Sequence, residues 1–309
     1  MQFSFTINKL AVFYFFVQNL SEWHFSNRKD YNILWRGELG QFSSEEEGVI
    51  KQLGKIHLRY PFGKQYLGRY FFLEENPWGI LEQKISLEDF IILKDIFSIL
   101  ENKFNIFWKR EEPLLLAWQI ELSSKINIPP LIAQVVELLK VIFNTSPSEV
   151  DIRVNLLPSS PTHTGGGTNI DSKNISLEIS RYPLQQINHA MSLVWHESIH
   201  LCFQKQYFLP LISEEFPDDQ QKVDLISEIA IRSLFPRGIL GIRLFKNKPR
   251  PKLMNETSPQ QTIEFLNLAK EYIDNKKSFD KEYVQKMSRI LGRKKEPDTF
   301  ASDPTGNRS

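Results

Sequence analysis

The stretch V-W-H-E-S-I-H-L-C-F, residues 194–203, decides how this chain is interpreted. It contains the pattern H-E-x-x-H as His196, Glu197 and His200, with apolar residues on both sides. Residues four apart stack on one face of a helix, so the two imidazoles can converge on one metal ion. Glu197 lies about 60° around the helix from His200 and can reach a water at the metal without being a ligand. The pattern therefore predicts a zinc site with His196 and His200 as ligands and Glu197 as general base.

The segments around this motif predict a small sheet followed by helices. Residues 150–156 (VDIRVNL) and 175–179 (ISLEI) alternate apolar and polar side chains, which is typical of strands with one buried face. A long helix is expected from Pro183 through the motif to about Gln206. Further helices are expected at residues 222–235, 259–275 and 280–291.

The chain is expected to divide into three parts, which together predict an α+β fold. Residues 1–145 form a mainly helical N-terminal region, and the apolar run at residues 10–17 (LAVFYFFV) predicts a buried helix within it. That run is too short to cross a bilayer, and no small-x-small cleavage site follows it. A linker-like cluster of Thr, Ser and Pro then leads into the candidate catalytic half, residues 146–293. The tail, residues 294–309, lacks apolar periodicity and is expected to be disordered.

Three signals set helix boundaries inside the N-terminal region. Ser86 precedes two acidic residues and predicts the N-cap of a helix that reaches Phe104. Pro113 is expected to interrupt the helical pattern, because proline lacks the backbone N–H that a helix interior needs. The pair Pro129–Pro130 is expected to open another helix over residues 131–143.

Composition excludes several classes of protein. The net charge of +1 over 309 residues is not that of a typical nucleic-acid binder. The basic segment 243–252, with Lys246, Lys248 and Arg250, contains prolines and is expected to be a solvated loop rather than a phosphate-binding patch. The single cysteine, Cys202, allows no disulfide within the chain and is expected to be a core residue rather than a catalytic thiol. A cytoplasmic protein without a nucleic-acid or membrane partner is expected, and its oligomeric state stays open.

The motif and the strand-then-helix order before it resemble the zincin superfamily of zinc metallopeptidases. The resemblance implies a peptide or protein substrate, bound in extended form by a strand beside the active-site helix. Residues 150–156 and 175–179 are both candidates for that strand. Phe203 and Gln206 stand where the metzincin pattern requires Gly and a third ligand, which excludes that branch. The gluzincin branch takes its third ligand from a glutamate on a later helix, and Glu228 is the best match here.

Glu228 also has a second interpretation. Asp224, Glu228 and Arg232 are spaced by four and could form a solvent-facing ionic stripe. Apolar residues on most other positions of this helix favour burial instead, and a buried carboxylate needs a partner such as a metal. Arg232 stands where the family often has aspartate, which departs from the pattern. The alternative acids are Glu214, Glu215, Asp219 and Asp224.

Other residues near the motif are candidates for supporting roles. His189 precedes His196 by seven residues on nearly the same helix face, and is expected to pack or support the site rather than to bind metal. Gly165–Asn169 (GGGTN) lacks the ending of a phosphate-binding loop and is expected to be a flexible turn that could line the substrate cleft. An oxyanion stabiliser is also expected, with four candidates: His163, Tyr182, Tyr207 and Arg232.

Peptide-bond hydrolysis is the function that the resemblance implies. Two alternatives stay open. A regulatory or interaction protein could retain a zincin-like zinc site with little general peptidase activity. A purely structural helical protein could carry the motif by accident, and then it would bind no metal.

Overall fold

The structure is a computed structural model of the chain, and it describes residues 1–23, 28–61, 66–147, 150–169 and 174–293. Helices surround one four-stranded sheet, so the predicted α+β class is confirmed. Within these residues, no helix combines the length and the apolar composition that a bilayer crossing requires. The predicted disorder of residues 294–309 lies outside the described residues.

Within the described residues, seven helices lie between the first and second strands, and the other helices follow the fourth strand. The strands are β1 (Gln2–Thr6), β2 (Asp151–Leu157), β3 (Gly165–Asn169) and β4 (Asn174–Glu178). The first helices are α1 (Lys9–Leu20), α2 (Lys29–Leu39), α3 (Ser44–Arg59), α4 (Gly68–Leu73), α5 (Pro77–Lys84), α6 (Leu87–Ile126) and α7 (Pro129–Ile142). The later ones are η2 (Leu184–Gln186), α8 (Ile187–Cys202), η3 (Gln204–Phe208), α9 (Leu209–Glu215), α10 (Gln220–Leu234), α11 (Ile239–Phe245), α12 (Pro259–Asp274) and α13 (Lys281–Gly292).

Most of the elements expected in the second half are confirmed to within two residues, namely β2, β4, α10, α12 and α13, and so is α7. The helix that carries the motif begins later than expected and ends sooner. A 3₁₀ turn, η2, precedes α8, and the π-helical turn η3 follows it. The buried helix expected at residues 10–17 is α1, which is apolar all round and is buried along nearly its whole length.

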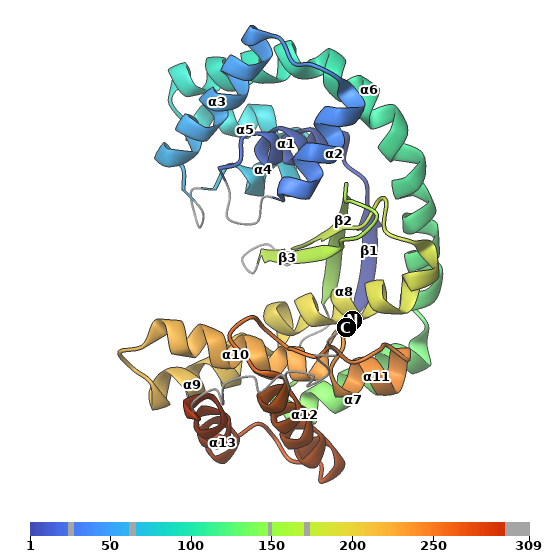
Figure 1. The fold of residues 1–309 in the computed structure, drawn as a ribbon, viewed down its shortest axis with the longest axis vertical. Helices are drawn as coiled ribbons and strands as arrows, with labels where there is room; N and C mark the ends of the chain where they lie inside the picture. The colour runs from blue at the N-terminus through green and yellow to red at the C-terminus, as the bar shows by residue number, and fades with distance from the viewer. Residues whose placement is uncertain (24–27, 62–65, 148–149, 170–173, 294–309) are drawn as a thin grey trace, which may run out of the picture.

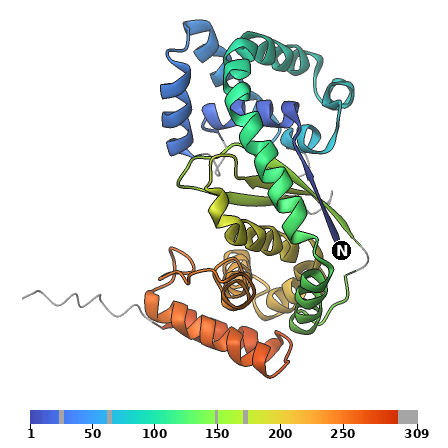
Figure 2. The same ribbon diagram turned by 90° about the vertical axis from the view of Figure 1, so that its right-hand side faces the viewer.

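The sheet lies in the middle of the molecule, with α1–α5 on one side and α8–α13 on the other (Figure 1). Its strand order is β1-β2-β4-β3, with β1, β2 and β4 parallel and β3 antiparallel to β4. The helix α6 runs past the sheet from one group of helices to the other (Figures 1 and 2). The helix α8 packs beneath the sheet, where every residue from His189 to Ile199 is buried.

The N-terminal strand joins the region expected to be helical to the sheet of the second half. Phe3 and Phe5 of β1 point into the core, and β1 pairs in parallel with β2. The ring of Phe3 meets that of Trp195 on α8 edge to face, with 5.1 Å between centroids. The first residues of the chain therefore help to build the layer that carries the motif.

The expected interruption at Pro113 is wrong, because α6 continues through it to Ile126. Pro113 has no N–H to donate to the carbonyl of Lys109, one turn earlier. Both residues are exposed, so water can replace the missing hydrogen bond. The buried stripe continues on both sides of the proline, through Phe107 before it and through Leu115 and Trp118 after it. Packing of this stripe outweighs the local cost of the proline.

Candidate metal centre

Two helices bring His196, His200 and Glu228 together. The histidines lie on α8 and Glu228 on α10, and one ligand atom from each falls within 4.8 Å of the others. The Nε2 atoms of the two histidines are 3.4 Å apart. Oε1 of Glu228 lies 3.6 Å from Nε2 of His196, and Oε2 of Glu228 lies 3.3 Å from Nε2 of His200. Ligand atoms about 2.0–2.1 Å from a tetrahedral zinc lie roughly 3.3–3.4 Å from one another. The donor set therefore fits zinc in both chemistry and spacing.

Hydrogen bonds at the other ring nitrogens orient the two imidazoles. His196 Nδ1 lies 3.1 Å from the backbone oxygen of Phe235, and His200 Nδ1 lies 2.6 Å from Oε1 of Gln204. The amide of Gln204 donates in turn to the hydroxyl of Ser227 on α10. Such partners leave Nε2 free for a metal and hold each ring in place. The π-helical turn that positions Gln204 could not be read from the pattern, and neither this residue nor Phe235 was expected at the site.

The charges around Glu228 keep it ionised. Its burial favours the neutral acid, but hydrogen bonds from His196 and His200 and the charge of Arg232 outweigh that effect and hold its pKa below the usual range. Arg232 Nε donates to Glu228 Oε1 at 2.5 Å, so part of the expected ionic stripe does form. Asp224, one turn earlier, is exposed and bonds Gln220 instead. Glu228 thus faces both the histidines and Arg232.

Glu197 lies beside this set without belonging to it. Its side chain is buried, and it lines the same cavity as the three candidate ligands. The hydroxyl of Thr168 on β3 donates to Oε2 of Glu197 at 2.5 Å. A carboxylate held next to the ligand set has the position that a general base requires.

The glycine-rich segment Gly165–Asn169 is not the expected turn but the strand β3. It pairs with β4 and packs against α8, and among the described strands it forms one edge of the sheet. A Cβ atom at Gly166 would lie 2.8 Å from Cγ and Oε1 of Glu197, so only glycine lets this strand approach so closely. The two strands expected to bind substrate, β2 and β4, are interior strands with neighbours on both sides. Their main-chain groups are already paired, so that expectation is wrong.

A cavity of about 430 Å³ opens over the candidate ligands. Of the four residues considered for an oxyanion role, His163 and Arg232 line it, while Tyr182 and Tyr207 are not among the lining residues. His189 also lines it and does not belong to the ligand set.

The acids considered as alternatives to Glu228 lie outside the ligand set. Asp219 caps α10 by accepting from the backbone of Lys222, and Glu215 pairs with Lys281 and Gln285. Glu214 is exposed.

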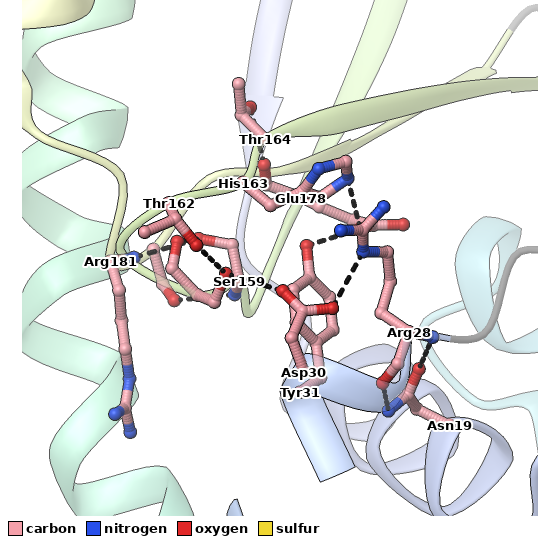
Figure 3. A network of polar contacts seen from close by, with 12 residues as sticks. Asn19, Arg28, Asp30, Tyr31, Ser159, Thr162, His163, Thr164, Glu178 and Arg181 are labelled. Atoms are coloured by element: carbon pink, nitrogen blue, oxygen red, sulfur yellow. Dashed lines mark hydrogen bonds and ion pairs between the residues drawn. The ribbon is translucent and has the colours of Figure 1, made fainter. Parts of the chain in front are cut away.

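The helical N-terminal region contacts a glutamate that lies beside the cavity lining. Tyr31 of α2 donates its hydroxyl to Oε2 of Glu178 at 2.7 Å, and His163 lies 3.9 Å from the same oxygen (Figure 3). Burial raises the pKa of Glu178 to about 7 and lowers that of His163 to about 4. His163 is therefore a neutral imidazole at physiological pH, able to donate one hydrogen bond into the cavity.

Taken together, the cavity contains two imidazoles and a carboxylate at zinc-binding spacing, a separate carboxylate beside them and an edge strand along one side. That arrangement can hold a divalent metal and can accept a proton from a water next to it. Comparison of the chain with protein-family models, with curated proteins and with solved structures finds no match in any of the three.

Proposed function

We propose that this protein is a zinc-dependent metallopeptidase, with His196, His200 and Glu228 as metal ligands and Glu197 as general base. The observation that carries the proposal is the spacing of the ligand atoms, 3.3–3.6 Å between each histidine and the carboxylate and 3.4 Å between the histidines. A chance pair of histidines on one helix face would have no reason to have a third zinc ligand within 3.3–3.6 Å.

The roles of the surrounding residues follow from their positions. A bound zinc ion would supply Lewis acidity, polarising the substrate carbonyl and making water in the site more acidic. Glu197 would accept a proton from the attacking water and return it to the leaving amine, and Thr168 would keep its carboxylate in place. His163 and Arg232 line the cavity and could donate hydrogen bonds to the developing oxyanion.

The strand β3 supports a peptide as the substrate. An edge strand presents unpaired main-chain N–H and C=O groups, and an extended peptide can pair with them as an additional strand. Gly165 and Gly166 of β3 line the cavity, so a peptide along this edge would pass over the ligand set. The absence of side chains at these positions leaves room for its main chain to approach.

Metal content is the first test. Purified protein given one equivalent of zinc and then dialysed is expected to retain about one zinc per chain by mass spectrometry. The His196→Ala/His200→Ala variant should retain none, and Glu228→Ala should bind zinc more weakly because it removes one of three protein ligands. Asp224→Ala is the matched control, since Asp224 is exposed on the same helix and lies outside the ligand set. Retention of zinc by the double variant would exclude this site as the metal centre.

Hydrolysis is the second test, with cleavage of a mixed peptide library followed by mass spectrometry. Glu197→Gln should keep the fold and the zinc but lose at least ~100-fold in rate, because the amide cannot accept the proton. Equal cleavage by this variant would remove Glu197 from the mechanism.

A second candidate function is a regulatory protein that keeps the zinc site with little turnover. The ion pair between Arg232 and Glu228 favours it, because it draws charge away from a metal ligand. Zinc retention with no cleavage of any library peptide would support this candidate over the peptidase.

A further inference from the structure

A bound zinc ion would give the lining of the cavity an excess of positive charge. Arg232 and Arg250 line it, and among the described residues its only acidic lining residues are Glu197 and Glu228, both already assigned to the site. The two arginines offset the two carboxylates, so a zinc ion would leave the lining with two excess positive charges. A cavity with such an excess attracts anions.

Arg250 and the neighbouring Arg237 have no counter-charge of their own. Neither makes an ion pair or a side-chain hydrogen bond within the part of the chain that the structure describes. Partial burial, followed by repulsion from Arg237 and Arg232, lowers the pKa of Arg250 below its usual value. Arg250 lines the metal cavity and Arg237 the adjoining one, and like charges held near each other gain stability when an anion joins them.

His189 provides a second and independent observation. Its side chain is 4% exposed, and its Nδ1 atom has no hydrogen-bond partner among the described residues. Burial, with Arg237 and Arg250 nearby, lowers the pKa of His189 to about 3, so the ring is neutral. It lines both the metal cavity and an adjoining cavity of about 300 Å³ that Arg237 also lines. A buried polar atom without a partner at this junction indicates a site that is completed by a ligand.

Arg250 comes from the segment 243–252, whose sequence indicated a solvated loop. Lys246 and Lys248 are exposed as that expectation requires, although Arg243 lies in the helix α11. Arg250 is exposed as well, but it also lines the metal cavity. One arginine of the basic segment therefore lies at the candidate metal centre.

We propose that Arg250 and Arg237, with His189 beside them, form a subsite for a substrate carboxylate next to the scissile bond. The proposal rests on the peptidase function above and adds a substrate class to it. Guanidinium groups bind carboxylates through paired, charge-assisted hydrogen bonds, which matches a free peptide C-terminus and an Asp or Glu side chain equally well.

The test uses two small probes that anchor at zinc through a hydroxamate. Succinic monohydroxamate carries a carboxylate, and succinamic hydroxamate carries a neutral amide in the same place. The acid should bind the zinc-loaded protein about tenfold more tightly than the amide, measured by calorimetry, because it gains a charge-assisted hydrogen bond. Equal affinities would overturn the subsite.

Variants identify the residues responsible. Arg250→Gln and Arg237→Gln should each bring the ratio of the two affinities toward one. Arg243→Gln is the matched control, since Arg243 pairs with Asp274 and does not line the cavity, and it should leave the ratio unchanged. A ratio that survives both cavity variants would assign the preference elsewhere and overturn the proposal.

Peptide substrates separate the two sources of carboxylate and separate this proposal from the peptidase function. Peptides of one sequence are compared with a free or amidated C-terminus, and with Glu or Gln beside the cleaved bond. Faster cleavage of the free-acid peptide identifies the C-terminus, and faster cleavage of the Glu peptide identifies the side chain. If the acid probe binds more tightly than the amide probe but no peptide is cleaved, the subsite is retained and the peptidase function is refuted. If peptides are cleaved but the two probes bind equally, the peptidase function is retained and the subsite is refuted.

Discussion

The two histidines of the site are held by different kinds of group. His196 is oriented by the backbone oxygen of Phe235, and His200 by the side chain of Gln204, which is anchored to Ser227. A backbone partner survives substitution of its residue, but a side-chain partner does not. The orientation of His200 is thus the more sensitive to sequence change. Glu197 depends on β3 in a similar way, through Thr168 and the missing side chain at Gly166.

Gly166→Ala is expected to displace Glu197 while leaving the metal ligands in place. The new methyl group would lie 2.8 Å from Cγ of Glu197, so either the strand or the carboxylate must move. The rate of peptide cleavage should fall about tenfold or more, because small misplacements of a catalytic group are costly. Zinc content should not change.

Gly167→Ala is the matched control for that variant. A Cβ atom at Gly167 would meet nothing within 4 Å, so cleavage should stay close to that of the unmodified protein. Equal losses in the two variants would show that β3 tolerates no substitution at all, and would contradict the specific role given to Gly166.

At the scale of elements, a buried ionic network joins α2, α6 and the segment that leads from β4 into the helix of the motif. Arg181 follows β4 and bonds both Glu38 of α2 and Glu111 of α6. Glu111 is fully buried, and burial raises its pKa, although Ser180 and Arg181 act in the opposite direction. The network fixes where the chain leaves the sheet, and therefore where α8 begins.

Arg181→Met is expected to destabilise the protein by about 3–5 kcal/mol, because it leaves Glu111 buried without its partner. The free energy of unfolding in urea is the measurement. The double variant Arg181→Met/Glu111→Gln should recover part of the loss, since the unpaired charge is gone. Arg243→Met, which breaks an exposed pair with Asp274, should cost no more than about 1 kcal/mol. Comparable losses in the two single variants would contradict this account.

At the scale of the whole molecule, the helical N-terminal region and the candidate catalytic half share one sheet and one core. The strand β1 completes the sheet beside β2, and its Phe3 packs on Trp195, the neighbour of His196. The long helix α6 contacts β1, β2 and α8, and Tyr31 of α2 bonds Glu178 of β4. The boundary expected near residue 145 therefore cuts through contacts that support the site.

A fragment that begins at residue 146 is consequently expected not to fold. It would lack β1, and the edge of β2 and the face of Trp195 would be exposed. Circular dichroism should show no cooperative unfolding for the fragment, while the full chain should unfold in one transition. A fragment that unfolds cooperatively and binds zinc would establish an independent domain.

Local periodicity predicted what depends on near neighbours along the chain. The i, i+4 spacing put His196 and His200 on one helix face, and alternation predicted β2 and β4, because these patterns follow from backbone geometry alone. The apolar surroundings of Glu228 predicted a buried carboxylate, and its side chain is 23% exposed and faces the two histidines.

Contacts between distant segments decided the features of the fold and site that local patterns did not predict. The pairing of β1 with β2 joins residues far apart in sequence, and Gly165–Asn169 becomes a strand only because β4 and α8 lie beside it. Pro113 stays helical because the stripe around it packs against the remainder of the molecule. The sequence by itself determined the motif and its helix, whereas the tertiary structure decided which strand borders the cavity, which side chains orient the ligands and where the arginines gather. The physical reason is that hydrogen-bond pairing and packing across the chain outweigh local preference wherever the two disagree.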